Sequence, residues 1–465
     1  MNGGTLAILG YVALQLVIGY FASRGIRTEK DYLLAGRRLG PGLVFFSVFA
    51  TWFGAETCIG AAGEAYASGL SAVRADPFGY AICLLLMSLL LAVPLWKSGF
   101  TTLGDLFRER FGRRAEKVAV FIMVPSSVMW AGAQVRAFGQ VLTSSSGAPD
   151  EQNALLMTTV AAAVVIAYTT VGGMLADAYS DLIQGIVLIS GLLMLLVFAY
   201  TSGDLAHLGS INAAHLALVA PGEGLLDVAE SWAVPIFGSL VAQELVSRVI
   251  AARSPEVARN ASLLAVPFYL MIGIIPVVVG LLGSVITPDI ADPEHVLPAT
   301  AARYFSPVLM VIFQGSIVAA ILSTVDTTLI ASGSLVAHNL YLPLHKQASD
   351  AQKVLANRIA VAAFGVIAYG LALLSDSVYE LVEAASAFGS AGILVCTLLG
   401  LFTSLGGERT ALATLITGVG VYAVQAHLVE AAHPFLSSIA SALAVYAIGG
   451  ALEGRAATTT ADMAE

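Results

Sequence analysis

One long apolar segment of this chain carries hydroxyl and carboxylate side chains in its middle. The segment, FQGSIVAAILSTVDTTLIASGSLVAHNLY at 313–341, is long enough to cross a bilayer as a helix. Side chains three or four residues apart share a helical face, so Ser323, Asp326 and Thr327 point the same way, with Thr324 beside them. Hard cations prefer oxygen ligands. The pattern therefore indicates a site for a small cation such as sodium.

Helix packing is the alternative explanation for these polar residues. Ser and Thr often fill close contacts between membrane helices, and packing accounts well for one or two of the hydroxyls. A carboxylate at membrane depth is costly and usually serves a function. Because Asp326 belongs to the cluster, we favour ion binding over packing.

The composition indicates an all-α polytopic membrane protein. Hydrophobic residues make up 58% of the chain and charged residues only 11%, whereas soluble domains have about 25% charged residues. The net charge of −9 says little about partners, because the placement of Lys and Arg matters more in membranes. The three cysteines lie in apolar runs, so neither a disulfide framework nor a thiolate metal site is predicted.

About thirteen transmembrane helices are predicted from the apolar runs. The first is expected to be retained rather than cleaved as a signal, because it has no basic region before it and is followed by charged residues. The expected spans are 5–22, 42–70, 76–97, 115–143, 153–171, 180–201, 230–250, 262–287, 306–337, 354–374, 378–402, 409–428 and 433–450.

The basic residues predict the orientation of these spans in a plasma membrane or bacterial inner membrane. The opposite loops, such as 144–152 and 202–229, contain acidic residues but no Lys or Arg. By the positive-inside rule the N-terminus is outside and the C-terminus is cytoplasmic. The basic residues that follow odd-numbered spans are Arg24, Arg27, Lys30, Arg37, Arg38, Lys97, Arg108, Arg110, Arg113, Arg114, Lys117, Arg248, Arg253, Arg259, Lys346, Lys353, Arg358, Arg409 and Arg455.

Two predicted spans are interrupted by glycine or proline. Gly54 and two further glycines lie in span 42–70, and Pro235 and Gly238 lie in span 230–250. Glycine also occurs in ordinary helix packing, but such breaks are typical of backbone that lines a cavity. The two spans begin five-helix groups of opposite orientation. This arrangement is typical of an inverted-repeat transporter with its site at the membrane midplane.

The spans divide the chain into six parts. They are 1–41 with the first helix and a cytoplasmic loop, 42–201 as the first five-helix repeat, 202–229 as an extracellular loop, 230–402 as the second five-helix repeat, 403–450 with two further helices, and 451–465 as a cytoplasmic tail.

Three motifs in this chain resemble those of the sodium:solute symporter family. KDYLLAGR at 30–37 is similar to the signature before the family's first core helix, and GGMLAD and SDLIQ at 172–177 and 180–184 resemble its GG–A–TD–Q segment. AILST at 320–324 resembles its sodium motif. The resemblance implies a LeuT-type 5+5 inverted repeat with one helix before it and two after it. It also implies sodium-driven uptake of sugars, amino acids, vitamins or small carboxylates, as in the sodium-coupled sugar, proline, pantothenate and sialic acid transporters.

The resemblance further implies the ligands of a shared sodium site. These are the backbone carbonyls of Ala50 and Phe53 at the break in span 42–70, the carbonyl of Ala320, and the hydroxyls of Ser323 and Thr324. Unwound backbone carbonyls replace the water shell of the ion.

Some members of the family bind a second sodium ion one helical turn further along. The matching positions here are Asp181, Asp326 and Thr327. Asp326 stands where those members have a hydroxyl. This leaves open a second sodium ion, a bound proton, or one proton shared between two acids.

The solute is expected to bind beside the break, at Trp52, Glu56, Thr57 and Gln243. Arg136 lies among apolar residues within a span, and a guanidinium suits bidentate capture of a carboxylate. Alternatively, Arg136 extends to the outer interface or pairs with an acidic side chain. We therefore favour a solute that bears a carboxylate, such as an amino acid or organic acid.

A sodium-coupled secondary-active symporter that imports a small polar solute is the expected function. A proton-coupled symporter and a transporter-like sensor that signals to a separate protein are the alternatives. An enzyme is not expected, because the seven histidines are scattered and no nucleotide or metal motif is present. The expected partners are the solute, Na+ and the lipid bilayer, without nucleic acid, and the protein is expected to function as a monomer.

Overall fold

The computed structural model describes residues 24–146 and 151–454, with isolated positions between 8 and 21. The regular structure of these residues is helical, apart from an isolated bridge between Leu39 and Ala252, which confirms the predicted all-α class. The helices are α2 (Glu29–Leu34), α3 (Pro41–Trp52), α4 (Ala61–Ser68), α5 (Tyr80–Leu86), α6 (Ala92–Lys97), α7 (Leu103–Arg110), α8 (Arg113–Ser146), α9 (Glu151–Thr201), α10 (Leu225–Ala233), α11 (Gln243–Ile250), α12 (Pro255–Ile286), α13 (Val296–Tyr304), α14 (Pro307–Val336), α15 (Asp350–Leu374), α16 (Val378–Ala387), α17 (Ser390–Phe402), α18 (Glu408–His427) and α19 (Pro434–Glu453).

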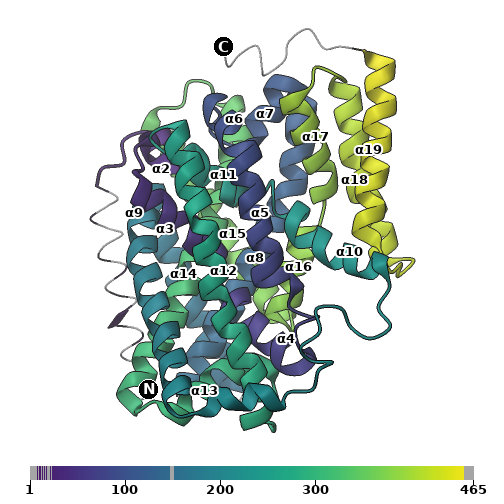
Figure 1. Ribbon diagram of the computed structural model, residues 1–465. Helices are drawn as coiled ribbons and strands as arrows, with labels where there is room; N and C mark the ends of the chain where they lie inside the picture. The colour runs from purple at the N-terminus through teal and green to yellow at the C-terminus, as the bar shows by residue number, and fades with distance from the viewer. Residues whose placement is uncertain are drawn as a thin grey trace.

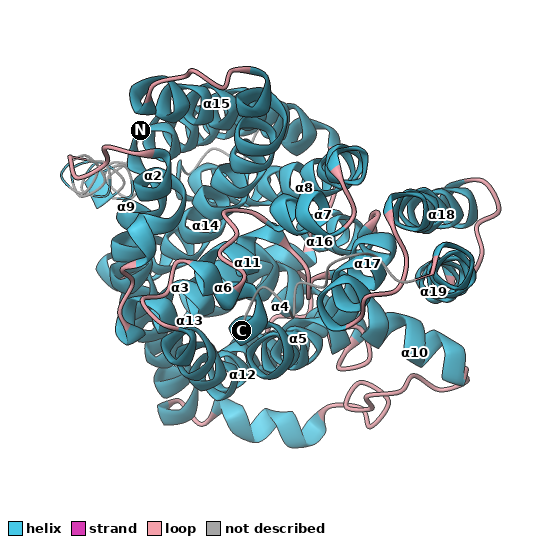
Figure 2. Ribbon diagram, turned by 90° about the horizontal axis from the view of Figure 1, so that it is seen from above, coloured by secondary structure: helices cyan, strands magenta, loops and turns pink. Residues whose placement is uncertain are grey.

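The long helices lie side by side in one bundle, and α14 runs through its interior (Figure 1, Figure 2). α14 packs against α3, α8, α9 and α15, and every residue from 316 to 335 is buried. All faces of this segment therefore contact protein rather than lipid, including the face with Asp326. α18 and α19 pack on each other at one side of the bundle.

Short breaks bend three of the spans. α3 meets the helical segment Glu56–Ser68 at 53°, and segment Leu225–Gly238 meets α11 at 42°. These are the two breaks predicted from glycine and proline. A third bend, of 43° between α16 and α17, was not predicted from the sequence. Gly389 lies at this bend with φ +68°, a backbone conformation that favours glycine.

The count of thirteen spans is not confirmed. Among the described residues, seven helices are long and apolar enough to cross a membrane, or ten if each bent pair is one span. α9 contains two expected spans on either side of Gly173, which has φ +65° and ψ 176°. α18 matches the expected span 409–428 to within one residue at each end. The expected span 5–22 lies largely outside the described residues.

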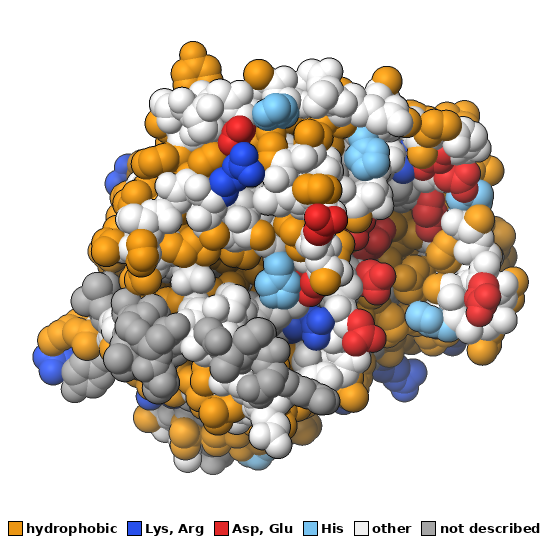
Figure 3. Space-filling view, turned by 90° about the horizontal axis from the view of Figure 1, so that it is seen from below, with side chains coloured by type: hydrophobic (Ala, Val, Ile, Leu, Met, Phe, Trp, Pro, Cys, Tyr) orange, Lys and Arg blue, Asp and Glu red, His pale blue; other side chains and the backbone are white. Residues whose placement is uncertain are grey.

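The segments expected to be cytoplasmic lie at one end of the bundle. α2 and α7 are at the end drawn uppermost in Figure 1, and α4 and α13 are at the other end. Figure 3 views this second end, where Asp and Glu side chains gather near the centre. Part of loop 202–224 docks there, because Leu70 N donates to the His215 carbonyl at 2.8 Å and Arg74 pairs with Glu223.

The orientation itself remains a prediction that cysteine labelling can test. A single cysteine replacing Asn212 should react with a membrane-impermeant maleimide in intact cells, and one replacing Gln347 should react only after permeabilisation. The native Cys58, Cys83 and Cys396 are buried, so their background reaction should be low. The reverse pattern of reactivity would contradict the orientation and the span assignment behind it.

Candidate functional site

The break after α3 exposes backbone groups in the middle of the bundle. α3 begins with Pro41, which suits a first helical position, and ends at Trp52. Phe53 leaves the helical conformation with φ −93° and ψ 68°. A Cβ added at Gly54 would lie 2.6 Å from both the Thr324 hydroxyl oxygen and a Glu56 carboxylate oxygen. Only glycine therefore fits this close approach of α3 to α14.

Three of the five predicted sodium ligands meet at this approach. The Thr324 hydroxyl lies 3.4 Å from the carbonyl oxygen of Ala50 and 3.3 Å from that of Ala320. The Thr51 carbonyl oxygen is also close, at 3.2 Å. The role of the Phe53 carbonyl as a fourth ligand remains a prediction. Neutral oxygens from α3 and α14 therefore lie within 3.4 Å of the Thr324 hydroxyl, and the sodium site itself stays a prediction.

Ser323 connects this point to Asp181 of α9. The Ser323 hydroxyl donates to one carboxylate oxygen of Asp181, and the Ser47 hydroxyl of α3 donates to the other at 2.5 Å. Asp181 and Ser323 are fully buried. An acidic side chain therefore lies directly beside the predicted sodium position and joins α3, α9 and α14.

The other two residues of the predicted second cation site have different partners. Asp326 accepts a hydrogen bond from the Thr169 hydroxyl at 2.5 Å, and its buried Oδ2 has no hydrogen-bond partner among the described residues. The Thr327 hydroxyl instead contacts Arg248 and lies 3.4 Å from the Thr51 hydroxyl. The role of this set as a cation site remains a prediction.

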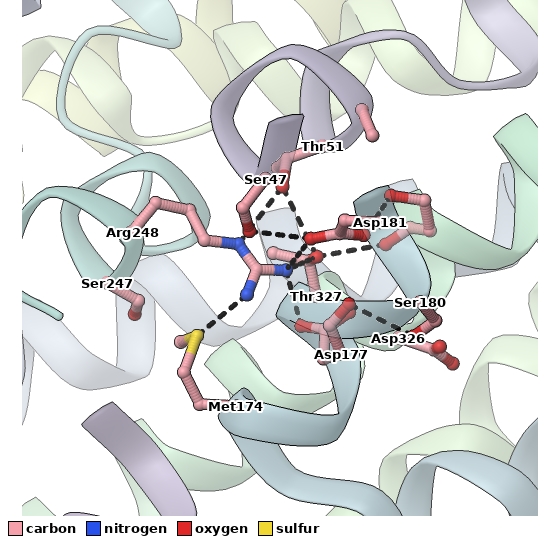
Figure 4. A network of polar contacts seen from close by, with 12 residues as sticks. Ser47, Thr51, Met174, Asp177, Ser180, Asp181, Ser247, Arg248, Asp326 and Thr327 are labelled. Atoms are coloured by element: carbon pink, nitrogen blue, oxygen red, sulfur yellow. Dashed lines mark hydrogen bonds and ion pairs between the residues drawn. The ribbon is translucent and has the colours of Figure 1, made fainter. Parts of the chain in front are cut away.

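Arg248 of α11 lies at the centre of this polar network (Figure 4). Its guanidinium donates to Asp177 and Thr327, and to the Thr51 hydroxyl at 3.1 Å. It also lies 3.5 Å from Asp181. Its side chain is fully buried, so the sequence interpretation of Arg248 as a basic residue flanking the cytoplasmic end of a span is wrong.

The sequence does contain a signal for Arg248. Gln243, Glu244, Ser247 and Arg248 stand at helical spacing directly after the predicted break, and all four are buried. A polar face of this kind on a membrane helix points to the bundle interior. Its partner Asp177 lies in the GGMLAD motif, although no role was predicted for it.

A second buried polar cluster follows the break. Glu56 accepts hydrogen bonds from Trp130 Nε1 at 3.1 Å and Gln134 Nε2 at 2.7 Å. Gln134 also accepts from the backbone N–H of Ala55 at 2.9 Å, so its side chain holds the chain just after the break.

Thr57 turns toward Asp76, a residue that the sequence analysis did not single out. The Thr57 hydroxyl donates to one Asp76 carboxylate oxygen at 2.6 Å, and Tyr269 OH donates to the other at 2.8 Å. Asp76 and Glu56 are both fully buried or nearly so. Within the described part of the chain, neither carboxylate forms an ion pair with Lys, Arg or His within 4 Å.

Aromatic rings surround Trp52 in this region. The Trp52 ring lies edge-to-face with Trp130, with centroids 5.0 Å apart, and with Tyr80, with centroids 6.4 Å apart. Trp52 Nε1 is buried and has no hydrogen-bond partner within the described ranges. The region thus combines ring surfaces with unpaired buried carboxylates.

A small cavity of about 30 Å³ adjoins this region. Its lining residues include Trp130, Gln243, Glu244 and Ser386. In the part of the chain that the structure describes, the buried Glu244 Oε1 has no hydrogen-bond partner. A cavity of this size holds about one or two water molecules. An organic solute can therefore enter only if the surrounding helices or side chains move.

Arg136 points away from these clusters. Its guanidinium donates to the backbone carbonyls of Ser375 at 2.5 Å and Asp376 at 2.6 Å, in the loop between α15 and α16. This position agrees with the alternative in which the side chain extends to the outer interface. The sequence could not distinguish the two, because position along a helix does not determine its facing.

Comparison with known protein families gives a match over most of the chain. The model of the sodium:solute symporter family matches residues 32–418. Curated relatives include the high-affinity choline transporter 1 of Drosophila melanogaster, 27% identical over 81% of this chain and 63% of the relative, so the match leaves over a third of that protein uncovered. The high-affinity proline transporter PutP of Bacillus subtilis (strain 168) is 26% identical over 89% of this chain and 90% of its own.

Solved structures share the fold. A substrate-bound, outward-open Na+-coupled sialic acid symporter has a TM-score of 0.83 at 15% identity, covering 98% of this chain and 99% of its own. Mhp1, a nucleobase-cation-symport-1 family transporter in a closed conformation, has a TM-score of 0.60 at 14% identity, covering 89% and 92%. The predicted LeuT-type fold is confirmed.

These matches agree with the three sequence motifs and with the helix breaks. The matched family and the named relatives are transporters rather than enzymes. Since the family model covers most of the chain, this multi-pass membrane protein belongs to the sodium:solute symporter family.

Proposed function

We propose that this protein is a sodium-coupled symporter that imports, by alternating access, a small polar solute with a cationic nitrogen. The observation behind the charge of the solute is the burial of Glu56 and Asp76 beside the broken helix without a basic partner in the described part of the chain. A buried carboxylate is costly unless a cation or a proton offsets its charge. A cationic solute would supply that charge each time it binds.

The aromatic side chains support the same class of solute. Trp52, Tyr80 and Trp130 form adjoining ring surfaces, and Trp130 both lines the cavity and donates to Glu56. Cations bind over such ring faces at about 6 Å or less from the centroid, most strongly where water is excluded. A cationic nitrogen near Trp130 would gain from the rings and from the carboxylate together.

The solutes named for the relatives support a cationic nitrogen on the solute. They do not decide whether the solute also bears a carboxylate. Choline, named for the relative in Drosophila melanogaster, carries a quaternary ammonium and no carboxylate. Proline, named for the relative in Bacillus subtilis, carries both an ammonium and a carboxylate. Of the two carboxylate-bearing solutes expected from the sequence, we therefore retain an amino acid, which also has a cationic nitrogen. A simple organic acid, which has none, is disfavoured.

Sodium would couple to the solute through the break after α3. Sodium held by the Ala50 and Ala320 carbonyls and the Thr324 hydroxyl would draw the end of α3 toward α14. Glu56 and Thr57 follow the same break within a few residues. Sodium that fixes the backbone at the break would therefore also fix the position of these two side chains, which are predicted to bind the solute. By linkage, the solute would raise the affinity for sodium by the same factor as sodium raises that for the solute.

Substitutions of Glu56 and of Arg136 distinguish a solute whose cationic nitrogen binds Glu56 from a solute whose carboxylate binds Arg136. In proteoliposomes with an inward sodium gradient, uptake of choline, proline and lactate would identify a transported solute. Glu56→Gln should raise its half-saturating concentration about tenfold to hundredfold, because a charge-assisted contact is lost. Sodium binding without solute should change little. The Arg136 guanidinium donates to the backbone carbonyls of Ser375 and Asp376, so Arg136→Gln should change solute affinity less than about threefold.

Each alternative has its own outcome in this assay. Lactate uptake that fails in Arg136→Gln but survives in Glu56→Gln would contradict the cationic solute and support capture of a carboxylate by Arg136. Uptake that ignores sodium and follows an imposed pH gradient would favour a proton-coupled symporter. Solute-dependent thermal stabilisation without any uptake would favour a sensor.

A further inference from the structure

An open groove of about 850 Å³ lies between the end of α14 and the first half of α15, away from the candidate site. Its apolar wall includes Leu344, Leu355 and Ile359, which are 75%, 55% and 61% exposed. Ala360 and Ala363 lie deeper along the same helix and leave room between the two walls. The groove is therefore an apolar slot on an exposed face of α15, one of the helices long and apolar enough to cross a membrane.

The opposite part of the groove is polar and basic. Tyr341, His345, Lys346 and Gln352 line it where the chain turns from α14 into α15. The His345 ring stacks on the Tyr341 ring, with centroids 4.1 Å apart. Lys346 is exposed and forms no ion pair within 4 Å among the described residues, so its ammonium is free to bind an anion.

The distance between the two parts suits an amphipathic molecule. From Gln352 to Ala363, α15 advances about 16 Å at 1.5 Å per residue, which runs from the turn down into the apolar region. The turn lies at the same end of the bundle as α2 and α7, the end predicted to be cytoplasmic. A molecule in this groove would place a polar group at the interface and an apolar chain along α15.

We propose that this groove binds one glycerophospholipid with an anionic headgroup, from the leaflet at this end of the bundle. The phosphate would contact Lys346 beside the Tyr341–His345 stack, and an acyl chain would cover Leu355 and Ile359. Basic pockets between helices at the cytoplasmic interface bind anionic headgroups, and each Lys near the surface adds to that attraction. A zwitterionic lipid such as phosphatidylcholine would fill the apolar part equally well and also has a phosphate. Its headgroup ammonium, however, repels the Lys346 ammonium and offsets much of that attraction, so a lipid with a net negative headgroup should bind more tightly.

The lipid would brace the end of the helix that carries the predicted sodium ligands. The segment Ala337–Tyr341 continues α14 and forms one wall of the groove. On its other face, the Asn339 side-chain amide donates to Asp105 of α7 at 3.0 Å and to Glu116 of α8 at 2.8 Å. A lipid on the outer face would hold this segment against α7 and α8 and so favour closure of this end.

Lipid retention by the purified full-length protein tests the proposal. The protein would be stripped of lipid in detergent and placed in nanodiscs of equal parts phosphatidylglycerol and phosphatidylcholine. After re-extraction, native mass spectrometry would count the lipids that remain bound. The wild type should keep about one phosphatidylglycerol in preference to phosphatidylcholine. Lys346→Glu should lower that retention about tenfold, because an attraction becomes a repulsion.

Two further variants locate the binding. Ala360→Trp fills the apolar part and should reduce retention of both lipids. Lys117→Glu makes the same charge change at an exposed residue of α8 at the same end and should retain lipid as the wild type does. Equal retention by Lys346→Glu and the wild type, or no preference of the wild type for phosphatidylglycerol, would overturn the proposal. Lys346 is exposed, so its variant should fold even if Ala360→Trp does not.

Discussion

Thr324→Ala should raise the sodium concentration for half-maximal uptake about tenfold to hundredfold. Its hydroxyl lies 3.4 Å from the Ala50 carbonyl oxygen and 3.3 Å from that of Ala320, so its removal takes one ligand from the predicted sodium site. Contacts between a neutral polar group and a charge contribute about 1.5–3 kcal/mol each, which gives this range. Uptake measured at increasing sodium concentrations in proteoliposomes, at fixed pH, would give the value.

Matched variants on α14 separate a lost ligand from general damage to the helix. Thr328→Ala removes a buried hydroxyl that donates within its own helix, to the Val325 carbonyl at 2.9 Å, and should leave sodium dependence near that of the wild type. Thr324→Ser keeps the hydroxyl and should restore most of the affinity. Equal effects of Thr324→Ala and Thr328→Ala would show that the site lies elsewhere.

Ser323→Ala should also weaken sodium binding, but through a second route. The Ser323 hydroxyl donates to Asp181, so the substitution removes a predicted ligand and also leaves one Asp181 oxygen without that donor. Replacement of sodium by potassium would show whether the lost affinity belongs to sodium. Uptake that is insensitive to sodium but follows a proton gradient would instead make Asp181 and Asp326 candidates for proton transfer.

Arg248→Met should lower the free energy of unfolding by about 3–5 kcal/mol, the cost of removing one partner from a buried ion pair. The guanidinium is fully buried between Asp177 and Asp181, and its loss leaves both carboxylates without a cation. Arg248→Lys keeps the charge but not the planar fork that reaches several oxygens, so it should recover only part of the stability. Thermal unfolding in detergent would rank the variants.

A double substitution tests whether the charge is the cause. Arg248→Met combined with Asp177→Asn removes one acid with the base, and the pair should be more stable than the sum of the two single effects predicts. Arg253→Met, at an exposed residue three positions beyond α11, should be near neutral. A single Arg248→Met variant as stable as Arg253→Met would contradict the central role of this arginine.

The sequence alone determined the class, the fold type and the position of the sodium motif. Apolar runs predicted the spans because a membrane helix must be apolar over the thickness of the bilayer. Glycine and proline predicted a break at Gly54 and another in the span that holds Pro235 and Gly238, where the helix breaks just after Gly238, because these residues disrupt helix hydrogen bonding or conformation. Helical spacing also predicted that the polar face of α14 is functional, and the structure buries that face in the bundle.

Only the tertiary structure decided which side chains meet. Helical periodicity relates residues within one helix, but it does not determine which neighbour a face contacts. Thus Asp76 meets Tyr269 across 193 positions of the chain, and Arg248 reaches Asp177 across 71 positions. Arg136 and Arg248 both lie within expected spans, 115–143 and 230–250, yet the first meets loop carbonyls and the second lies at the centre of the bundle. The two arginines differ because α8 and α11 pack against different helices. A local sequence pattern contains no information about that packing.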